Sequence, residues 1–346
     1  MKKAFLLFLS CAVLHVATAL AEDQEWSLKN QILGVKAKFT VRVVDENGKP
    51  VEGAKVWARF SQSSRGKFTV DEKLTGQDGC VTVSGRCDFY TRFVIAKDGY
   101  YETSHTIEYD KDGYELKGSK WQPYGGMVEY LLKRKHNPGP MIVFRYLEFP
   151  VPECDRDYGF DMEYGALVEP YGPGKVADFY IRYTMEGAPY VMSGNKEGGG
   201  RSLTLSFPNC LDGAYLIPLD MDSKFQSPYQ VDMNANYTKN FTWKVMWGEG
   251  IVGYKQETLE EGQGLILRTR TKVDAEGNLV SAHYGKIYGN WDVCGRLTEK
   301  RPCINKGGII FFNPIENDTN LEFDNQWHAE LRKQGGLVPE GGLFSW

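Results

Sequence analysis

The sequence has few of the residues on which enzyme active sites most often depend. It contains five histidines, and His105, His136, His283 and His328 are scattered rather than paired. No Gly-x-Ser-x-Gly and no Cys-x-x-Cys occurs, so neither a nucleophile beside a histidine base nor a zinc site is indicated. Acidic turns such as Asp155-Arg156-Asp157 do not continue into a calcium loop. We therefore expect no enzyme activity, no metal and no cofactor.

Strong charge of one sign and long apolar runs are also missing. The formal net charge is −4, which disfavours a duplex nucleic-acid partner because such proteins are usually basic. After residue 21 no apolar run approaches the ~20 residues that a membrane helix needs. The sequence predicts no nucleic-acid partner and no transmembrane span in the mature chain.

The N-terminus is typical of a secretory signal peptide. The positively charged stretch Met1-Lys2-Lys3 precedes the apolar segment Ala4–Val16, and the small-x-small stretch Ala19–Ala21 precedes Glu22. A signal peptide that is cleaved off as residues 1–21 predicts an exported protein that is periplasmic, cell-surface or secreted. Cys11 follows Phe-Leu-Ser, so a lipid anchor there stays open as the alternative to cleavage after Ala21.

Glycine and tyrosine are abundant, at 38 and 20 residues, and helical periodicity is scarce. This composition is typical of β structure with frequent turns. Apolar residues alternate in Phe39–Val44, and Asp45–Gly48 supplies turn chemistry. The alternating run Ala54–Phe60 is expected to return antiparallel to the first strand. The stretch therefore predicts a module of short strands.

Three pieces of this module carry a resemblance. They are V-x-D-x-N-G-K-P-V-x-G-A-x-V at residues 43–56, T-G-Q-D-G at 75–79 and A-K-D-G-Y-Y at 96–101. Over about residues 36–132 the chain resembles the carboxypeptidase regulatory-like domain, a small transthyretin-like β-sandwich. The resemblance implies a non-catalytic accessory domain that acts as a spacer, a fold support or a binding module.

A basic, proline-rich segment at residues 134–140 predicts a linker between a first domain at 22–133 and a second at 141–325. The Asn-Pro-x-Pro-Met linker and the D-Y-G-F-D segment at 157–161 resemble those of exported bacterial proteins of no known activity. We expect an all-β protein of two tandem β-sandwich domains, with a tail at 326–346 and a short helix near 325–334. The strands expected in the second domain are 176–183, 202–207, 240–247, 264–273, 279–288, 308–312 and 321–323.

Cysteine usage fits an oxidising compartment. Without Cys11, the remaining six of the seven cysteines form an even set that allows many pairings. The favoured pairs are Cys294 with Cys303, across a turn-like loop, and Cys154 with Cys210. Cys80 with Cys87 is the default pair of the first domain, although a strand that starts at Cys80 would place the two thiols at its opposite ends.

A row of aromatic and aliphatic side chains recurs with period two along residues 240–247. Its members are Phe241, Trp243, Val245 and Trp247. Exposed, Trp243 and Trp247 would form a platform that stacks on sugar rings. Facing inward, the row would be sandwich core, which is the favoured interpretation because alternating apolar residues normally mark a buried face.

A second row, made of Arg268, Arg270 and Lys272, alternates with apolar residues. It is either a solvated face or a surface that meets an acidic polymer.

The sequence thus favours a non-enzymatic structural or binding protein of the bacterial envelope, with a glycan or an envelope protein as its possible partner. A carbohydrate-binding accessory protein is the alternative. A polysaccharide hydrolase is a further one, and it would need two carboxylates converging in a cleft with raised pKa values.

Overall fold

The computed structural model describes residues 30, 33–62, 66–145, 149–188, 190, 197–291, 293, 303–304 and 308–323. Regular structure in these residues is almost entirely β-strand, which confirms the predicted all-β class. The chain divides into two compact units, one of Met1–Lys135 with Asp222–Phe225 and one of His136–Met221 with Gln226–Trp346. The predicted signal peptide, Cys294 with its proposed bond to Cys303, and the predicted short helix near 325–334 lie outside the described residues. No described segment forms a helix with the length and hydropathy needed to span a membrane.

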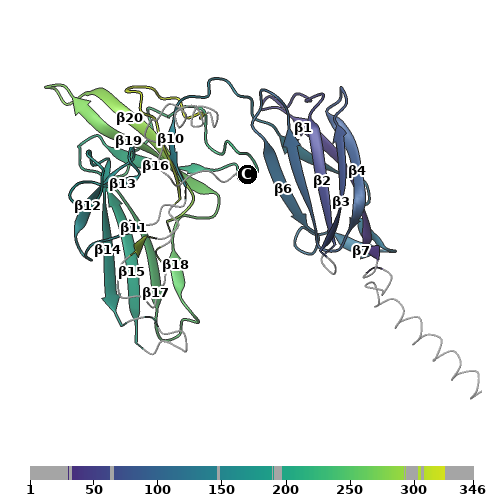
Figure 1. The fold of residues 1–346 in the computed structure, drawn as a ribbon, viewed down its shortest axis with the longest axis horizontal. Coiled ribbons are helices and arrows are strands. Elements are labelled where there is room, and N and C mark those ends of the chain that lie inside the picture. The colour runs from purple at the N-terminus through teal and green to yellow at the C-terminus, as the bar shows by residue number, and fades with distance from the viewer. Residues whose placement is uncertain are drawn as a thin grey trace, which may run out of the picture. The chain divides into compact units, whose positions relative to one another are not determined.

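Unit 1 is a sandwich of one mixed sheet and one antiparallel sheet (Figure 1). The first sheet, here called sheet 1A, has the order β4-β1-β8-β7, with β9 also paired to β1; the second, sheet 1B, has the order β3-β2-β5-β6. The strands of sheet 1A are β4 (Cys80–Cys87), β1 (Val35–Val44), β8 (Lys120–Gln122), β7 (Glu115–Lys117) and β9 (Gly126–Leu131). Those of sheet 1B are β3 (Lys67–Leu74), β2 (Lys55–Gln62), β5 (Tyr90–Ala96) and β6 (Thr103–Glu108).

The core of unit 1 lies between these sheets. Alternate residues of β1 and β2 point inward, and Phe39, Val41 and Phe60 are almost completely buried. The ring of Phe39 meets that of Phe93 edge-on, with 5.3 Å between centroids. Because burying one such side chain contributes about 1.5–3 kcal/mol, the period-two pattern is the main source of stability in this unit.

The path of the chain after β1 differs from the expected hairpin. The Oδ1 atom of Asp45 accepts hydrogen bonds from the backbone N–H groups of Asn47 and Lys49, at 2.9 and 3.0 Å, which closes the predicted turn. After Val51 bonds back to Val43, however, the chain crosses to the other sheet. β1 pairs with β4, β8 and β9, whereas β2 pairs with β3 and β5. The predicted antiparallel pairing of the first two strands is therefore wrong. The two strands lie in different sheets, and each turns its apolar face toward the core between those sheets.

Four residues from the second half of the sequence complete unit 1. The segment Asp222–Phe225 lies along β6, where Ser104 N donates to the carbonyl of Asp222 at 2.7 Å. Phe225 is fully buried and stacks on Tyr101, with 4.8 Å between ring centroids. The segment covers the edge of sheet 1B, which would otherwise present unpaired backbone groups. The sequence predicted a second domain that is continuous over 141–325, so the assignment of Asp222–Phe225 to unit 1 was not predicted.

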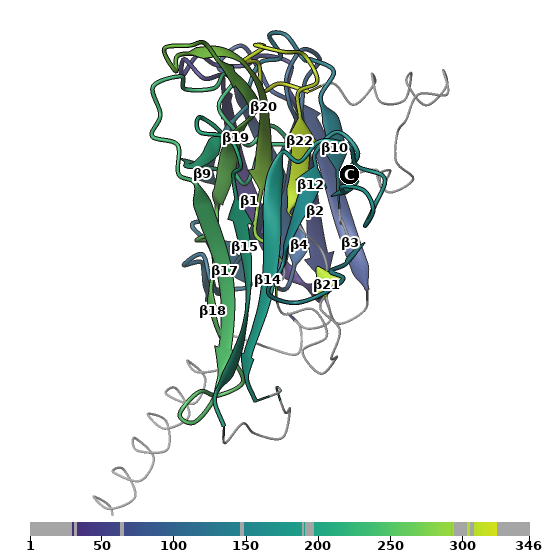
Figure 2. The same cartoon turned by 90° about the vertical axis from the view of Figure 1, so that its left-hand side faces the viewer.

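Unit 2 contains two larger sheets and one short strand pair. The first sheet, sheet 2A, has the order β13 (Ala166–Leu167), β12 (Asp157–Asp161), β14 (Phe179–Gly187), β15 (Gly199–Ser206), β17 (Asn240–Trp247) and β18 (Lys255–Glu257). Sheet 2B has the order β10 (Ile142–Phe144), β22 (Ile309–Phe312), β20 (Leu279–Tyr288), β19 (Gln263–Val273) and β16 (Gly213–Pro218). The short pair is β11 (Phe149–Pro150) with β21 (Cys303–Ile304). Figure 2 shows the long strands β14, β15 and β17 running side by side.

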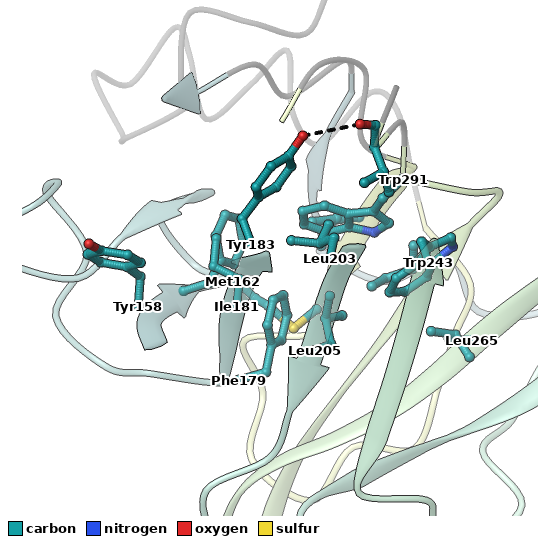
Figure 3. Packing of buried hydrophobic residues seen from close by; sticks show 14 of the residues in the cluster. Tyr158, Met162, Phe179, Ile181, Tyr183, Leu203, Leu205, Trp243, Leu265 and Trp291 are labelled. Atoms are coloured by element: carbon teal, nitrogen blue, oxygen red, sulfur yellow. Dashed lines mark hydrogen bonds between the residues drawn. The ribbon is translucent and has the colours of Figure 1, made fainter. Parts of the chain in front are cut away.

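Inward residues of sheets 2A and 2B form one continuous core (Figure 3). Phe179 and Trp243 from sheet 2A lie near Trp291, each with 6.3 Å between ring centroids. Leu265 and Ile287 from sheet 2B are fully buried in the same cluster. Unit 2 is therefore also a sandwich, built on the alternation that its strands predict.

Candidate functional site

The aromatic row of β17 faces the core of unit 2. Trp243 is 1% exposed and Trp247 is 3% exposed. Their indole N–H groups donate to Oδ1 of Asn290 and to the carbonyl of Ala188, both at 2.9 Å, which satisfies the polar atom of each buried ring. The core interpretation of this row is confirmed, and the sugar-binding platform of Trp243 and Trp247 is wrong.

The predicted basic row does not form either. Arg268 lies with its guanidinium carbon 3.8 Å from the ring centroid of Tyr237. Lys272 is exposed and forms an ion pair with Glu316 at 2.7 Å. Arg270, between them, turns into the protein. The three cations therefore have three different environments, and no shared surface exists for an acidic polymer.

A β-bulge explains the position of Arg270. The register between β19 and β20 shifts within Thr269–Lys272, and Arg270 has a φ of 52°, in the left-handed region. Its guanidinium thereby reaches Asp178 at 2.9 Å, Asp161 at 3.0 Å and Glu163 at 2.9 Å. A bulge re-aims one side chain, so alternation alone would have placed Arg270 on the wrong face.

The three carboxylates around Arg270 are held in place rather than presented to a substrate. Asp161 and Asp178 are buried, and each also accepts backbone hydrogen bonds, such as that from Met162 N to Asp178 at 2.7 Å. Burial lowers the pKa of Arg270, but its bonds to the carboxylates outweigh this and raise the pKa above its usual value. The ion pairs of Arg270 with Asp161 and Asp178 form an interior tie between sheets 2A and 2B.

A buried lysine forms a second polar network in unit 2 that sequence reasoning missed. Lys286 Nζ donates to Tyr288 Oη at 2.7 Å, to Ser227 Oγ at 3.0 Å and to the carbonyl of Leu321 at 2.7 Å. The ring of Phe311 lies 4.6 Å away. Burial raises the pKa of Tyr288. The signal in the sequence that could have revealed this network is a lysine within the apolar strand β20. The hydrogen bonds of Lys286 hold the loop segments that contain Ser227 and Leu321 against the outer face of sheet 2B.

Cys80, Cys87, Cys154 and Cys210 are free thiols. Cys80 and Cys87 occupy the two ends of β4, about 23 Å apart at the rise of a strand. They also lie on opposite faces, since their separation is odd. The predicted Cys80–Cys87 disulfide is therefore wrong, because a disulfide requires Cα atoms within about 7 Å. Cys154 and Cys210 are likewise free, so the predicted bond between them is not formed.

Within the described residues, no group of three or more His, Cys, Asp or Glu side chains could hold a metal ion.

The outer face of sheet 1B carries an unusual set of side chains. Phe68 and Leu74 of β3 are 53% and 64% exposed, and Val70 between them is also exposed. The guanidinium carbon of Arg59 lies 4.3 Å from the ring centroid of Phe68. Arg59 is also directly opposite Arg92 of β5. We call this surface the arginine–aromatic face; its members are Trp57, Arg59, Phe68, Val70, Leu74, Tyr90, Arg92 and Val94.

The electrostatics of the arginine–aromatic face favour an anionic partner. Like charges placed directly opposite each other on a sheet destabilise it, and Arg59 and Arg92 are placed in this way. In the described part of the chain neither arginine forms an ion pair. The nearby carboxylate of Glu72 is bound by Lys55 at 3.0 Å. The face therefore combines exposed apolar area with uncompensated positive charge.

Comparison with known proteins adds little to this picture. No family model matches the chain, and no curated protein matches it. Among solved structures, 3-chlorocatechol 1,2-dioxygenase from Rhodococcus opacus 1CP is 12% identical, with a TM-score of 0.25 and coverage of 30% of this chain and 60% of that chain. Hydroxyquinol 1,2-dioxygenase from Pseudomonas putida DLL-E4 is 17% identical, with a TM-score of 0.24 and coverage of 30% and 57%. Similarity at this level identifies neither a fold family nor a function for this chain.

A further solved structure is the dioxygenase domain of a dioxygenase carbohydrate-binding protein fusion from Streptomyces sp. SirexAA-E. It is 13% identical, with a TM-score of 0.24 and coverage of 30% of this chain and 82% of that chain.

Proposed function

We propose that this protein is an exported, non-enzymatic binding protein of the bacterial envelope, and that unit 1 is a carboxypeptidase regulatory-like module that docks a protein partner. The observation that supports the proposal is the arginine–aromatic face. Exposed Phe68 and Val70 lie beside Arg59 and Arg92 on the outer face of sheet 1B.

The composition of this face matches that of protein interfaces. Aromatic residues and arginine are enriched at the centres of such interfaces, and they dominate the binding energy there. Two adjacent arginines among apolar side chains fit a segment that carries a carboxylate between apolar residues. The partner expected on these grounds is an acidic segment of an envelope protein.

The polar clusters of unit 2 support a structural role for that unit. The carboxylates that converge near Arg270 are paired with it, whereas a polysaccharide hydrolase needs an acid and a base at the substrate. A hydrolase is therefore the less supported alternative.

Site-specific photo-cross-linking in the envelope tests the proposal. A photoreactive residue replaces Val70 in one variant and Val280, an exposed position in unit 2, in a matched control. We expect a discrete protein adduct from position 70 that position 280 does not give, and we expect Arg92→Glu to reduce its yield several-fold. Identical adduct patterns from both positions, or an adduct insensitive to Arg92→Glu, would overturn the proposal.

A further inference from the structure

Four cations form one row across the outer face of sheet 1A. Lys117 of β7 is directly opposite Lys120 of β8, Lys120 is opposite Lys36 of β1, and Lys36 is opposite Arg86 of β4. Directly paired residues point to the same face of a sheet. We call Lys117, Lys120, Lys36 and Arg86 the cationic row. It crosses four neighbouring strands, and at about 4.8 Å per strand it spans about 14 Å.

Local backbone geometry places the end of the row. Gly118 and Ser119 have φ values of 56° and 60°, as a two-residue hairpin turn of type I′ requires. This turn sets Lys117 directly opposite Lys120, and the carbonyl of Ser119 accepts a hydrogen bond from Lys36 N at 3.1 Å. The non-glycine residue in a left-handed conformation shows that the chain accepts some strain to make this turn.

The positive charge of this face is only partly compensated. Glu115 is paired with Lys117 at 2.7 Å, and Glu129 is paired with Arg42 at 2.9 Å. Lys38 adds another cation two residues from Lys36 on the same face of β1. In the residues that the structure describes, Lys36, Lys38 and Lys120 form no ion pair. Cations placed side by side repel one another, so the sheet accepts an unfavourable arrangement that a bound anion would relieve.

We propose that the cationic row binds a linear acidic polysaccharide, whose sugars carry carboxylate or sulfate groups. A chain of regularly spaced anions can follow a single row of cations across the strands. The exposed ring of Tyr124, 4.9 Å from Lys120 Nζ, supplies a flat surface on which a sugar can stack. The ligand and the surface differ from those of the proposed function, since the arginine–aromatic face belongs to the other sheet of unit 1.

Other polyanions fit the face less well. A duplex nucleic acid is recognised by strongly basic proteins, whereas this chain has a formal net charge of −4. A bilayer needs a broad apolar surface in addition to cations. Tyr124 and Met127 are the large exposed apolar side chains among the described residues of this face.

Binding of the mature chain, residues 22–346, to polygalacturonate tests the proposal, with uncharged dextran as the control ligand. The row variant is Lys36→Gln/Lys38→Gln/Lys120→Gln. The matched control, Lys111→Gln/Lys255→Gln/Lys272→Gln, removes the same charge from exposed lysines elsewhere. We expect the row variant to bind roughly tenfold more weakly, the combined effect of three exposed charge contacts. The control should keep its affinity, and added salt should weaken binding because it screens exposed charges.

A second variant, Tyr124→Ala, separates sugar recognition from charge alone. It should weaken binding to polygalacturonate but not to inorganic polyphosphate, which has no sugar ring. The proposal would be overturned if the row and control variants lost affinity equally, or if Tyr124→Ala kept its affinity for polygalacturonate. It would also be overturned if the protein did not bind polygalacturonate, or if it bound duplex DNA or phosphatidylglycerol vesicles more tightly. Thermal unfolding of every variant verifies that it is folded. A position-70 adduct that is insensitive to Arg92→Glu would overturn the proposed function and leave this result untouched, so the two proposals fail separately.

Discussion

Arg270 and Asp178 form a two-point ion pair in the interior of unit 2. Arg270 Nε donates to Oδ1 at 2.9 Å and Nη2 donates to Oδ2 at 3.0 Å, and the carboxylate of Asp178 is fully buried. The pair joins the bulged strand β19 to the segment that leads into β14. Two parallel hydrogen bonds fix both the distance and the orientation of the partners.

Replacement of Arg270 by methionine should destabilise unit 2 strongly. The change leaves the buried carboxylates of Asp161 and Asp178 without their cation, and an uncompensated buried charge costs about 3–5 kcal/mol. Urea unfolding followed by tryptophan fluorescence measures the loss. Lys272→Met is the control, because Lys272 is exposed, and its effect should be within about 0.5 kcal/mol. Equal stabilities of the two variants would contradict the role of Arg270 as an interior tie.

Trp243→Ala should also destabilise unit 2, by about 3–5 kcal/mol, since it removes a large side chain from a close-packed core. The same change also leaves Oδ1 of Asn290 without the indole donor. Val252→Ala, at a fully exposed position, is the control. Denaturant midpoints compare the two. A folded Trp243→Ala protein with unchanged stability would be incompatible with the burial of this ring.

His105 should titrate above its usual range. Its hydrogen bond to Asp222, at 2.9 Å, raises the pKa, although burial opposes the shift. A raised pKa in the folded state means that the pair stabilises unit 1 fully below about pH 6.5, the ordinary histidine value. This contribution is lost as pH rises through the raised pKa. Because both groups are partly exposed, it should stay below about 1 kcal/mol.

Titration of the His105 ring by NMR measures this pKa directly. In Asp222→Asn the value should fall toward that of an unperturbed histidine, and Lys272→Gln, in unit 2, serves as the charge control. An unchanged titration in Asp222→Asn would show that Asp222 does not set the pKa.

Cys87 should resist alkylation in the folded protein. Its thiol is buried against the hydroxyl of Tyr109 at 3.1 Å, and burial raises its pKa to about 12. The thiolate is the reactive form, so iodoacetamide at pH 8 should modify the exposed Cys210 and leave Cys87 unmodified until the protein is unfolded. Peptide mass spectrometry without reduction reports both outcomes. A linked Cys80–Cys87 peptide would contradict the strand geometry of β4.

Alternation of apolar residues predicted the strands that bury one face. β17 and β20 have the bounds expected for residues 240–247 and 279–288; β17 buries alternate residues, whereas β20 is buried on both faces from Tyr284 to Tyr288. The favoured inward orientation of Trp243 follows from the same rule. β3 was missed although Phe68, Val70 and Leu74 alternate with polar residues, and here the apolar side chains are exposed, so alternation alone does not say which face is buried.

Other features depend on contacts between segments far apart in the sequence. The Asn-Gly turn after β1 was predicted correctly, but a turn does not say in which sheet the next strand lies. The bulge that turns Arg270 inward has no marker in the local sequence, since a glycine is absent there. The cationic row arises from the register of four strands, of which β7 and β8 are three residues long and too short for a periodic pattern.

The place of Asp222–Phe225 in unit 1 also orders events during synthesis. A ribosome releases the strands of unit 1 first, yet the buried ring of Phe225, which stacks on Tyr101, arrives only after β10 to β16 have been made. Until then β6 keeps an open edge, the kind of surface to which other chains attach. Unit 1 is therefore finished late, and after a protease cut between Lys135 and His136 only non-covalent contacts would join residues 1–135 to Asp222–Phe225.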